Sequence, residues 1–196
     1  MKHIEVFPTR IWYKKLDELL VLHNDWIENL QAARDNRPES RSYSVKNGWQ
    51  GEVNLQSDIK FIALKDALMP VFNDTLKQLA PEKNIQYKVN AWANIQDHAG
   101  YNEAHVHPFS LFSAVYYLKV TNKSGRINFK DPRLGLQNHI FASSSNPPPP
   151  NNFSSIKIQP EEGLLLIFPS WLEHFTELNY DNEERISIAM NIDLNY

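Results

Sequence analysis

Apolar residues recur at helical spacing in the segments that precede Pro81. The first apolar stripe begins at Leu16 and predicts a helix that ends near residues 36–38. A second stripe, from Phe61 to Leu79, predicts another helix, which Pro70 should kink or divide. Two helices are therefore expected in this part of the chain, and Pro81 ends the second one.

Outside these helices, apolar and polar residues alternate in short segments rich in β-branched and aromatic side chains, which predicts strands. The expected strands are 4–13 (interrupted at Pro8), 85–95, 111–120, 126–129, 154–158, 164–168 and 185–194. The polar segment 39–57, with Gly48-Trp49 as a turn signal, and the segment 131–153 are expected to be connections. Helices followed by many short strands indicate an α+β, mainly β, fold: a jelly roll or sandwich with helices on the outer face of one sheet.

We expect one domain over residues 1–196, because a chain of this length buries a substantial core without dividing. Residues 1–81 would supply a strand and the supporting helices, and residues 82–196 would form the jelly-roll core with the site. The polar segment 134–152 is expected to be a lid, and the four prolines at 147–150 are expected to stiffen it.

Charge and composition exclude several classes of function. There are 20 basic and 23 acidic residues, so a general attraction to nucleic acid is not expected. The absence of cysteine excludes disulfides, thiolate metal sites and cysteine nucleophiles. No apolar run approaches the ~20 residues of a membrane helix, and residues 1–8 lack the apolar segment of a signal peptide. We therefore expect a cytoplasmic protein (in the host cytoplasm if phage-encoded) without a membrane partner, and homodimer formation is left open.

Three histidines and one arginine carry the clearest chemical signal. His105 and His107 are two residues apart, and side chains at that spacing leave the same face of an extended segment roughly 6.5–7 Å apart. His174 follows the strand expected at 164–168 and could complete a metal site with three imidazoles. Arg185 then opens an alternating strand that carries Ser187 on the same face, and a guanidinium beside a hydroxyl suits a carboxylate ligand.

Each of these residues also has an ordinary explanation when it is taken alone. The histidines could be solvated loop residues, and Arg185 could pair with Glu183 or Glu184 on an edge strand. Glu103 or Asp131 could supply a carboxylate ligand to a metal, although carboxylates in loops are usually solvated.

The combination resembles the iron(II)- and 2-oxoglutarate-dependent oxygenases, specifically a small uncharacterised branch common in bacterial and phage genomes. The resemblance covers residues 94–191 well, and its motifs are Tyr101-Asn102, His105-Val106-His107-Pro108, Ser113-Ala114-Val115-Tyr116-Tyr117-Leu118, Gly125, Asp131-Pro132-Arg133, Pro160-Glu161-Glu162-Gly163, Phe168-Pro169-Ser170-Trp171, His174 and Arg185-Ile186-Ser187.

This resemblance implies a double-stranded β-helix that binds Fe(II) and uses 2-oxoglutarate and O2 to hydroxylate a small-molecule or protein substrate, releasing succinate and CO2. His105, His107 and His174 match the positions of the metal ligands. Arg185 matches the residue that binds the distal carboxylate of 2-oxoglutarate, with Ser187 in support. Tyr116 or Tyr117 adds a hydroxyl to that site, and only one of them can face inward because neighbours on a strand alternate.

The chain departs from the wider family at His107, where most members have a carboxylate. A set of three neutral imidazoles also suits zinc, copper and nickel, so the identity of the metal is left open. The alternative from another class is a cupin-like module that binds a metal or a ligand without oxygenase turnover. A third interpretation is an interaction protein that binds its partner through the prolines at 147–150.

Overall fold

The computed structural model describes residues 2, 8–39, 44–83, 85–133 and 155–195. The expected lid at 134–152, with its prolines at 147–150, lies outside the described residues. In chain order the elements are β1 (Trp12–Lys15), the 3-10 helix η1 (Asp17–Leu22), α1 (His23–Asn36), β2 (Val45–Val53), the 3-10 turn η2 (Ile59–Phe61), α2 (Ile62–Leu79), β3 (Tyr87–Asn102), β4 (Phe112–Lys119), β5 (Ile127–Lys130), β6 (Ser155–Ile158), β7 (Leu164–Pro169), β8 (His174–Thr176) and β9 (Arg185–Leu194).

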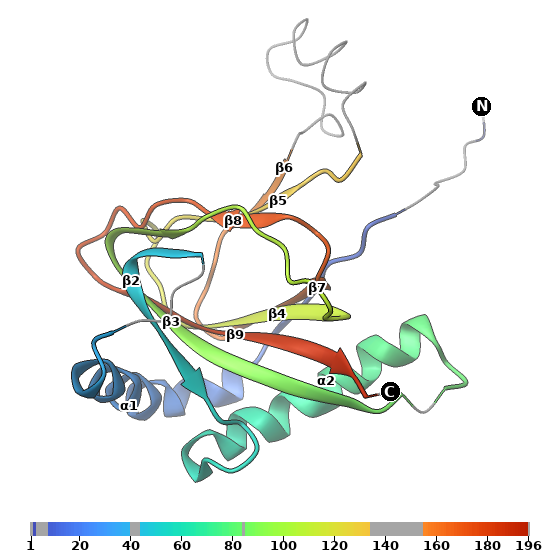
Figure 1. Ribbon diagram of the computed structural model, residues 1–196, viewed down its shortest axis with the longest axis horizontal. Helices are drawn as coiled ribbons and strands as arrows, with labels where there is room; N and C mark the ends of the chain where they lie inside the picture. Colours follow the sequence, from blue (N-terminus) through green and yellow to red (C-terminus); the bar gives the residue numbers. More distant parts are fainter. Residues whose placement is uncertain (1, 3–7, 40–43, 84, 134–154, 196) are drawn as a thin grey trace, which may run out of the picture.

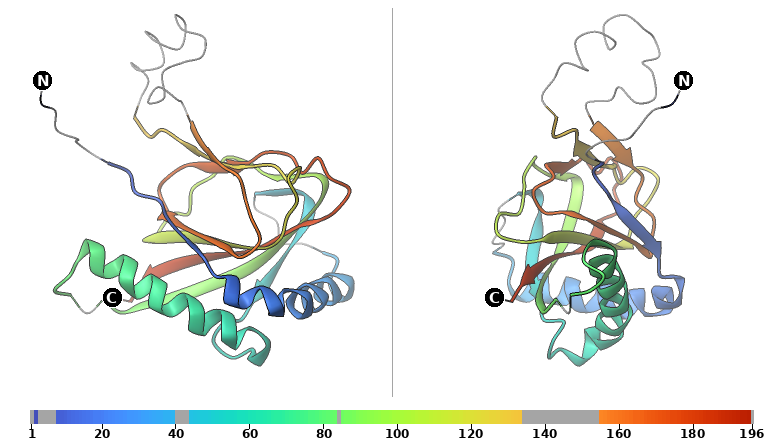
Figure 2. Two further views of the ribbon diagram at one scale, coloured as in Figure 1. Left: turned by 180° about the vertical axis from the view of Figure 1, so that it is seen from behind. Right: turned by 90° about the vertical axis from the view of Figure 1, so that its right-hand side faces the viewer.

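Two antiparallel sheets face each other and form a double-stranded β-helix, as expected (Figure 1). The larger sheet has the order β1-β7-β4-β9-β3-β2, and the smaller sheet has the order β6-β5-β8. Both helices lie on the outer face of the larger sheet, which the views in Figure 2 show from behind and from the side. Among the described residues, no helix is both long enough and apolar enough to cross a membrane.

The larger sheet is buried on both faces, and β9 shows how its side chains are divided. Its even-numbered residues 186–192 are apolar and pack against the helices in the larger core cluster. Its odd-numbered residues, Arg185, Ser187, Ala189 and Asn191, line a cavity between the two sheets. A smaller apolar cluster, which includes Val115 of β4, fills the rest of the space on that side. The strict alternation of one strand therefore supplies both a core and a polar site.

The sequence pattern missed two strands. Residues 39–57 were expected to be a polar connection, but β2 lies within them and pairs with β3 at the edge of the larger sheet. Trp49 and Val53 are buried against the helices, whereas the rest of the strand includes two glycines, Gly48 and Gly51, and several polar side chains that hide the alternation. The second strand, β8, has only three residues, which is too short to show a period.

The second predicted helix forms as one element. Pro70 lies inside α2, which runs from Ile62 to Leu79 without interruption, so the proline does not divide it. On the helix face that meets the sheet, Leu64, Leu68 and Phe72 are almost fully buried. Burial of this apolar stripe offsets the backbone hydrogen bond that a proline cannot donate.

Candidate active site

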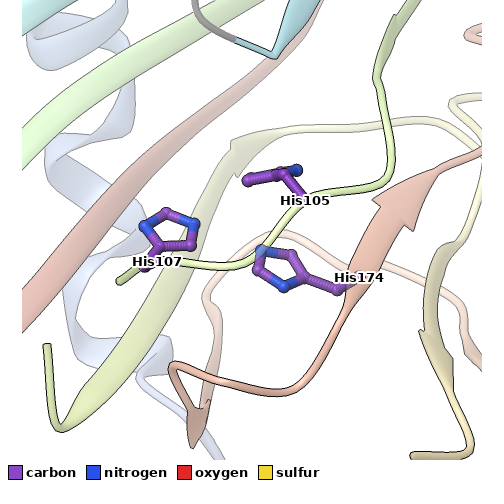
Figure 3. A group of neighbouring side chains, drawn as sticks. All are labelled: His105, His107 and His174. Carbon is purple, nitrogen blue, oxygen red and sulfur yellow. The ribbon is translucent and has the colours of Figure 1, made fainter. Parts of the chain in front are cut away.

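The structure brings His105, His107 and His174 together in the wall of the cavity between the sheets (Figure 3). One potential ligand atom from each ring lies within 4.8 Å of the others. The ring centroids are 4.4 Å apart for His105 and His174, 5.0 Å for His105 and His107, and 5.2 Å for His107 and His174. Three imidazoles at this separation can converge on one ion.

Backbone hydrogen bonds hold the two distant parts of the chain in this arrangement. The N–H of His105 donates to the carbonyl of His174, and the N–H of His174 donates back to the carbonyl of His105, both at 3.0 Å. A further bond runs from the N–H of His107 to the carbonyl of Ser170 at 2.9 Å. Paired residues in an antiparallel bridge project their side chains from the same face, which explains why these histidines meet.

Two of the three rings are fixed in the tautomer that leaves Nε2 free to bind a metal. Nδ1 of His105 lies 2.6 Å from the carbonyl of Glu103, and Nδ1 of His174 lies 2.9 Å from the carbonyl of Leu172. A carbonyl only accepts, so each Nδ1 carries the proton and each Nε2 keeps a free lone pair.

The surroundings keep all three rings neutral. Burial lowers the pKa of His105, and burial together with the neighbouring His105 lowers the pKa of His107 to about 4. Burial and the same neighbour lower the pKa of His174 to about 3. Neutral imidazoles at pH 7 offer their lone pairs to a cation without first releasing a proton.

His107 is held by side chains of the larger sheet. Its ring stacks on Trp92 with the centroids 5.6 Å apart, and a side-chain hydrogen bond joins it to Asn191. The hydroxyl of Ser113 donates to Oδ1 of Asn191 at 3.2 Å. These contacts hold the ring of His107 beside the other two imidazoles.

Arg185 is buried further inside the cavity and is 1% exposed. Its Nε donates to Oε1 of Gln96 at 2.6 Å, its Nη2 donates to Oγ1 of Thr176 at 2.8 Å, and its Nη1 donates to backbone carbonyls, including that of Ser124. Burial lowers the pKa of Arg185 to about 10, which leaves it charged at neutral pH. None of the described acidic residues forms an ion pair with it, so the described chain supplies no carboxylate to this buried cation.

The edge-strand explanation for Arg185 is therefore wrong. Glu183 pairs with Lys119 at 2.6 Å, and Glu184 pairs with Arg34 at 2.7 Å, both on the outside of the protein. Because Arg185 lies on β9, in the interior of the larger sheet, its side chain points away from these carboxylates and into the cavity.

The two tyrosines of β4 point in opposite directions. Tyr117 and Ser187 line the cavity next to Arg185, and Tyr117 is paired with Ser187 across the two strands. Tyr116 faces the helices, where its hydroxyl lies 2.8 Å from Nε2 of His23. The inclusion of Tyr116 among the candidate ligands of 2-oxoglutarate is therefore corrected, because strand alternation turns it to the other face.

The two carboxylates considered as metal ligands are engaged elsewhere. Glu103 pairs with Lys46 at 3.2 Å, and Asp131 accepts three hydrogen bonds from Arg133, two from its guanidinium and one from its backbone N–H. In the described part of the chain, the histidine cluster is the group that can hold a metal, and it contains no carboxylate.

Several site residues gave no signal in the sequence. Gln96 and Thr176 bond to Arg185, Asn191 and Trp92 contact His107, and Asn94 lines the cavity opposite Ser187. The signal that could have identified Asn191 is its position six residues after Arg185 on an alternating strand, which places both on one face. Trp92 lies in the cavity wall, where its ring stacks on His107.

The cavity has a volume of about 1500 Å³ and extends well beyond the histidines. Its lining includes Tyr117, Ile127 and Arg185 in one part and polar residues of β2 and β3, such as Gln50 and Asn90, in another. A cavity of this size leaves room for a second molecule beside a small ligand that reaches from the histidines to Arg185.

Comparison with known proteins agrees with this architecture. A family model described as "Putative 2OG-Fe(II) oxygenase" matches residues 90–191, more than half of the chain. No curated protein matches the sequence significantly. Among solved structures, a prolyl-4-hydroxylase of Pseudomonas putida has a TM-score of 0.68 at 11% identity, with 96% of this chain and 94% of that chain covered.

Two further solved structures have the same fold. HygX of Streptomyces hygroscopicus, solved with nickel and 2-oxoglutarate bound, has a TM-score of 0.66 at 10% identity, covering 96% of this chain and 84% of that one. The epimerase SnoN from nogalamycin biosynthesis has a TM-score of 0.64 at 12% identity, covering 94% of this chain and 76% of that one. Structural matches at identities this low show only that the fold is shared. The match to the family model shows which family the chain belongs to. The chain belongs to the 2OG-Fe(II) oxygenase family, whose cofactors are Fe(II), 2-oxoglutarate and O2.

Proposed function

We propose that this oxygenase is a hydroxylase in which His105, His107 and His174 hold Fe(II) and Arg185 holds the distal carboxylate of 2-oxoglutarate. Ser187 and Tyr117 flank that carboxylate in the proposal. The observation that carries it is the juxtaposition, in one cavity, of three neutral imidazoles and a buried guanidinium without a carboxylate partner among the described residues.

The donor set fits the metal. Nitrogen ligands of intermediate softness suit Fe(II), and the Nε2 lone pairs of His105 and His174 are free because their Nδ1 atoms donate to carbonyls. The guanidinium fits the co-substrate, because an unpaired buried cation is costly and a carboxylate ligand would neutralise it. The two sites lie in the same cavity, as a ligand that bridges them requires.

When bound, Fe(II) supplies the redox chemistry that converts 2-oxoglutarate, O2 and a C–H bond of the substrate into succinate, CO2 and an alcohol. The residues of this chain bind and orient the reactants. Arg185 fixes one end of the co-substrate, and the hydroxyls of Tyr117 and Ser187 add hydrogen bonds that water would otherwise supply. Apolar side chains that line the cavity, such as Val115 and Phe168, exclude water from the buried part of the site.

Hydroxylation is the finer part of the proposal. The family model establishes an oxygenase, and the solved structures with this fold include an epimerase as well as prolyl hydroxylases. A halogenase would need a ligand position left vacant for halide, and in this proposal His107 occupies that position. Hydroxylation requires no additional ligand and is therefore preferred.

The test is the formation of succinate from 2-oxoglutarate with Fe(II) and ascorbate, including turnover without a substrate. We expect slow succinate release by the wild type and none by His174→Ala, which removes a metal ligand. Arg185→Gln should weaken binding of 2-oxoglutarate by roughly 30-fold or more but leave the iron content intact, since loss of one member of a desolvated charge pair commonly costs 2–5 kcal/mol.

Arg34→Gln is the matched control, because it makes the same substitution at an arginine whose ion pairs lie on the surface. Its affinity for 2-oxoglutarate should equal that of the wild type. Tight zinc binding without any succinate release would contradict the proposal and would favour a cupin-like binding module.

A further inference from the structure

Arg185 belongs to a closed ring of hydrogen bonds made with uncharged partners, Gln96, Asn102 and Thr176. Nε of Arg185 donates to Oε1 of Gln96 at 2.6 Å, and Nε2 of Gln96 donates to Oδ1 of Asn102 at 2.8 Å. The backbone N–H of Asn102 donates to Oγ1 of Thr176 at 2.8 Å, and Nη2 of Arg185 closes the ring on the same oxygen at 2.8 Å. We refer to these four residues as the hydrogen-bonded ring.

The hydroxyl of Thr176 therefore accepts two hydrogen bonds. A hydroxyl oxygen has two lone pairs, so both are used and its own proton must point in a third direction. The described residues provide no acceptor for that proton, and Thr176 lines the cavity beside Arg185. Thr176 can then serve a ligand only as a donor, and the ligand atom that it meets must be an acceptor.

We propose that Thr176 donates its hydroxyl proton to the distal carboxylate of 2-oxoglutarate and that Gln96 is a positioning residue that orients Arg185 for the same carboxylate. This inference rests on the proposed function, because it takes Arg185 as the residue that binds that carboxylate. It adds a ligand contact on β8, two residues after His174 and on the same face of that strand.

The guanidinium stays available for an anion because its three partners in the hydrogen-bonded ring are uncharged. Gln96 is 1% exposed and satisfies Nε of Arg185 without neutralising its charge. Besides the nearby hydroxyl of Tyr117, Glu177 acts electrostatically on Arg185, and its carboxylate is bound outside the cavity by Arg126 at 2.9 Å and by Lys157 at 3.0 Å. The positive charge is thus oriented by neutral groups and is left for an anion from solution.

The test compares two ligands on the Mn²⁺-loaded protein by isothermal titration calorimetry. 2-Oxoglutarate has a distal carboxylate, whereas oxalate has two adjacent carboxylates and no distal one. We expect Thr176→Val to weaken binding of 2-oxoglutarate by roughly 10- to 100-fold, the usual effect of losing a hydrogen bond to a charged group, and to leave the affinity for oxalate unchanged. Thr176→Ser keeps the hydroxyl and should restore the affinity for 2-oxoglutarate.

Gln96→Glu tests the positioning role. A carboxylate at this position would still accept from Nε of Arg185, but it would neutralise the guanidinium. We therefore expect weaker binding of 2-oxoglutarate with unchanged binding of oxalate and Mn²⁺. Thr75→Val is the control for loss of a buried threonine hydroxyl far from the cavity, since Thr75 donates only to the carbonyl of Val71 within α2.

The outcomes separate this inference from the proposed function. If Arg185→Gln loses no affinity for 2-oxoglutarate, or loses the same factor for oxalate, Arg185 does not hold the distal carboxylate and the proposed function fails. If Arg185→Gln selectively weakens binding of 2-oxoglutarate but Thr176→Val loses nothing, or loses the same factor for both ligands, Thr176 acts only through the fold and the inference is overturned.

Discussion

Each histidine of the site is fixed by a different kind of neighbour. His105 and His174 are oriented by carbonyls of their own loops, and these contacts persist under any side-chain substitution that leaves the backbone in place. His107 depends on two side chains, the ring of Trp92 and the amide of Asn191. The third imidazole is thus the ligand whose orientation a single substitution can disturb.

This difference leads to a prediction at the residue scale. Asn191→Ala should lower the affinity for a divalent metal by about 10- to 100-fold, which is typical when a residue that orients a histidine ligand is removed. Competition with a chromogenic chelator measures the effect. Asn90→Ala is the matched control, because Asn90 is paired with Asn191 across the sheet but bonds to the exposed side of Asp193. Equal affinities in the two variants would contradict the role of Asn191.

Some site residues could be predicted from the sequence pattern and others could not. Alternation required one of Tyr116 and Tyr117 to face inward, but choosing between them needs the register of β4 against β9, which is a long-range property. The ring partners of Arg185 were not predictable, because Gln96, Asn102 and Thr176 come from two separate strands that meet only in the folded sheet. Their residue types carry no distinctive chemistry when read in order along the chain.

Among the elements, β9 was predicted with its observed limits and β2 was not predicted at all. The ten residues of β9 alternate strictly because one face meets the helices and the other meets the cavity. β2 is an edge strand with two glycines and a register shift between Lys46 and Gly48, so its period is broken where the pairing is irregular. A strand was therefore predictable where it was long and regularly buried. β8, which has only three residues, was missed as well.

The contact between α1 and the larger sheet should make the stability of the fold depend on pH. His23 begins α1 and is buried, with Nδ1 donating to the carbonyl of Leu118 and Nε2 accepting from the hydroxyl of Tyr116, both at 2.8 Å. Burial lowers the pKa of His23 below its ordinary value of 6.5. The folded state therefore resists protonation that the unfolded state accepts, and stability should fall as the pH drops below 6.5.

His23→Gln provides the comparison, because a glutamine can donate to Leu118 and accept from Tyr116 but does not titrate. We expect the free energy of unfolding in urea to fall between pH 7.5 and pH 5 in the wild type and to fall less in the variant. The site histidines contribute equally to both proteins and cancel in the difference. Identical pH dependence in the two proteins would contradict this, because it would mean that His23 binds a proton equally well in the folded and the unfolded state.

At the scale of the whole molecule, the site joins the two sheets. His174 and Thr176 belong to the smaller sheet, whereas Arg185 and Asn191 belong to the larger one. A metal together with a dicarboxylate that reaches Arg185 would bridge the sheets, and either ligand alone would make fewer of these contacts. Ligand binding should therefore stabilise the entire fold and not only the loops around the histidines.

We expect Mn²⁺ and 2-oxoglutarate together to raise the melting temperature by more than the sum of their separate effects. A ligand at 100 times its Kd adds about 2.7 kcal/mol to the free energy of unfolding. Differential scanning calorimetry on metal-depleted protein measures the shift. With His174→Ala, the added effect should disappear, and a synergistic shift that survived this substitution would place the ligands elsewhere.

The reciprocal backbone bonds between His105 and His174 have a consequence for how the protein acquires its metal. Small zinc domains are unfolded until the ion arrives, because nothing else holds their ligands in place. Here the main chain already holds two of the three ligands side by side, so chelation should leave a folded protein that can be reloaded. A rigid set of three imidazoles accepts any borderline divalent ion, in the order in which such ions prefer nitrogen. The ion found after purification would then depend on which metals are available in the expressing cell. Loading with iron in place of other divalent ions would depend on the metal supply of the cell and not on the protein.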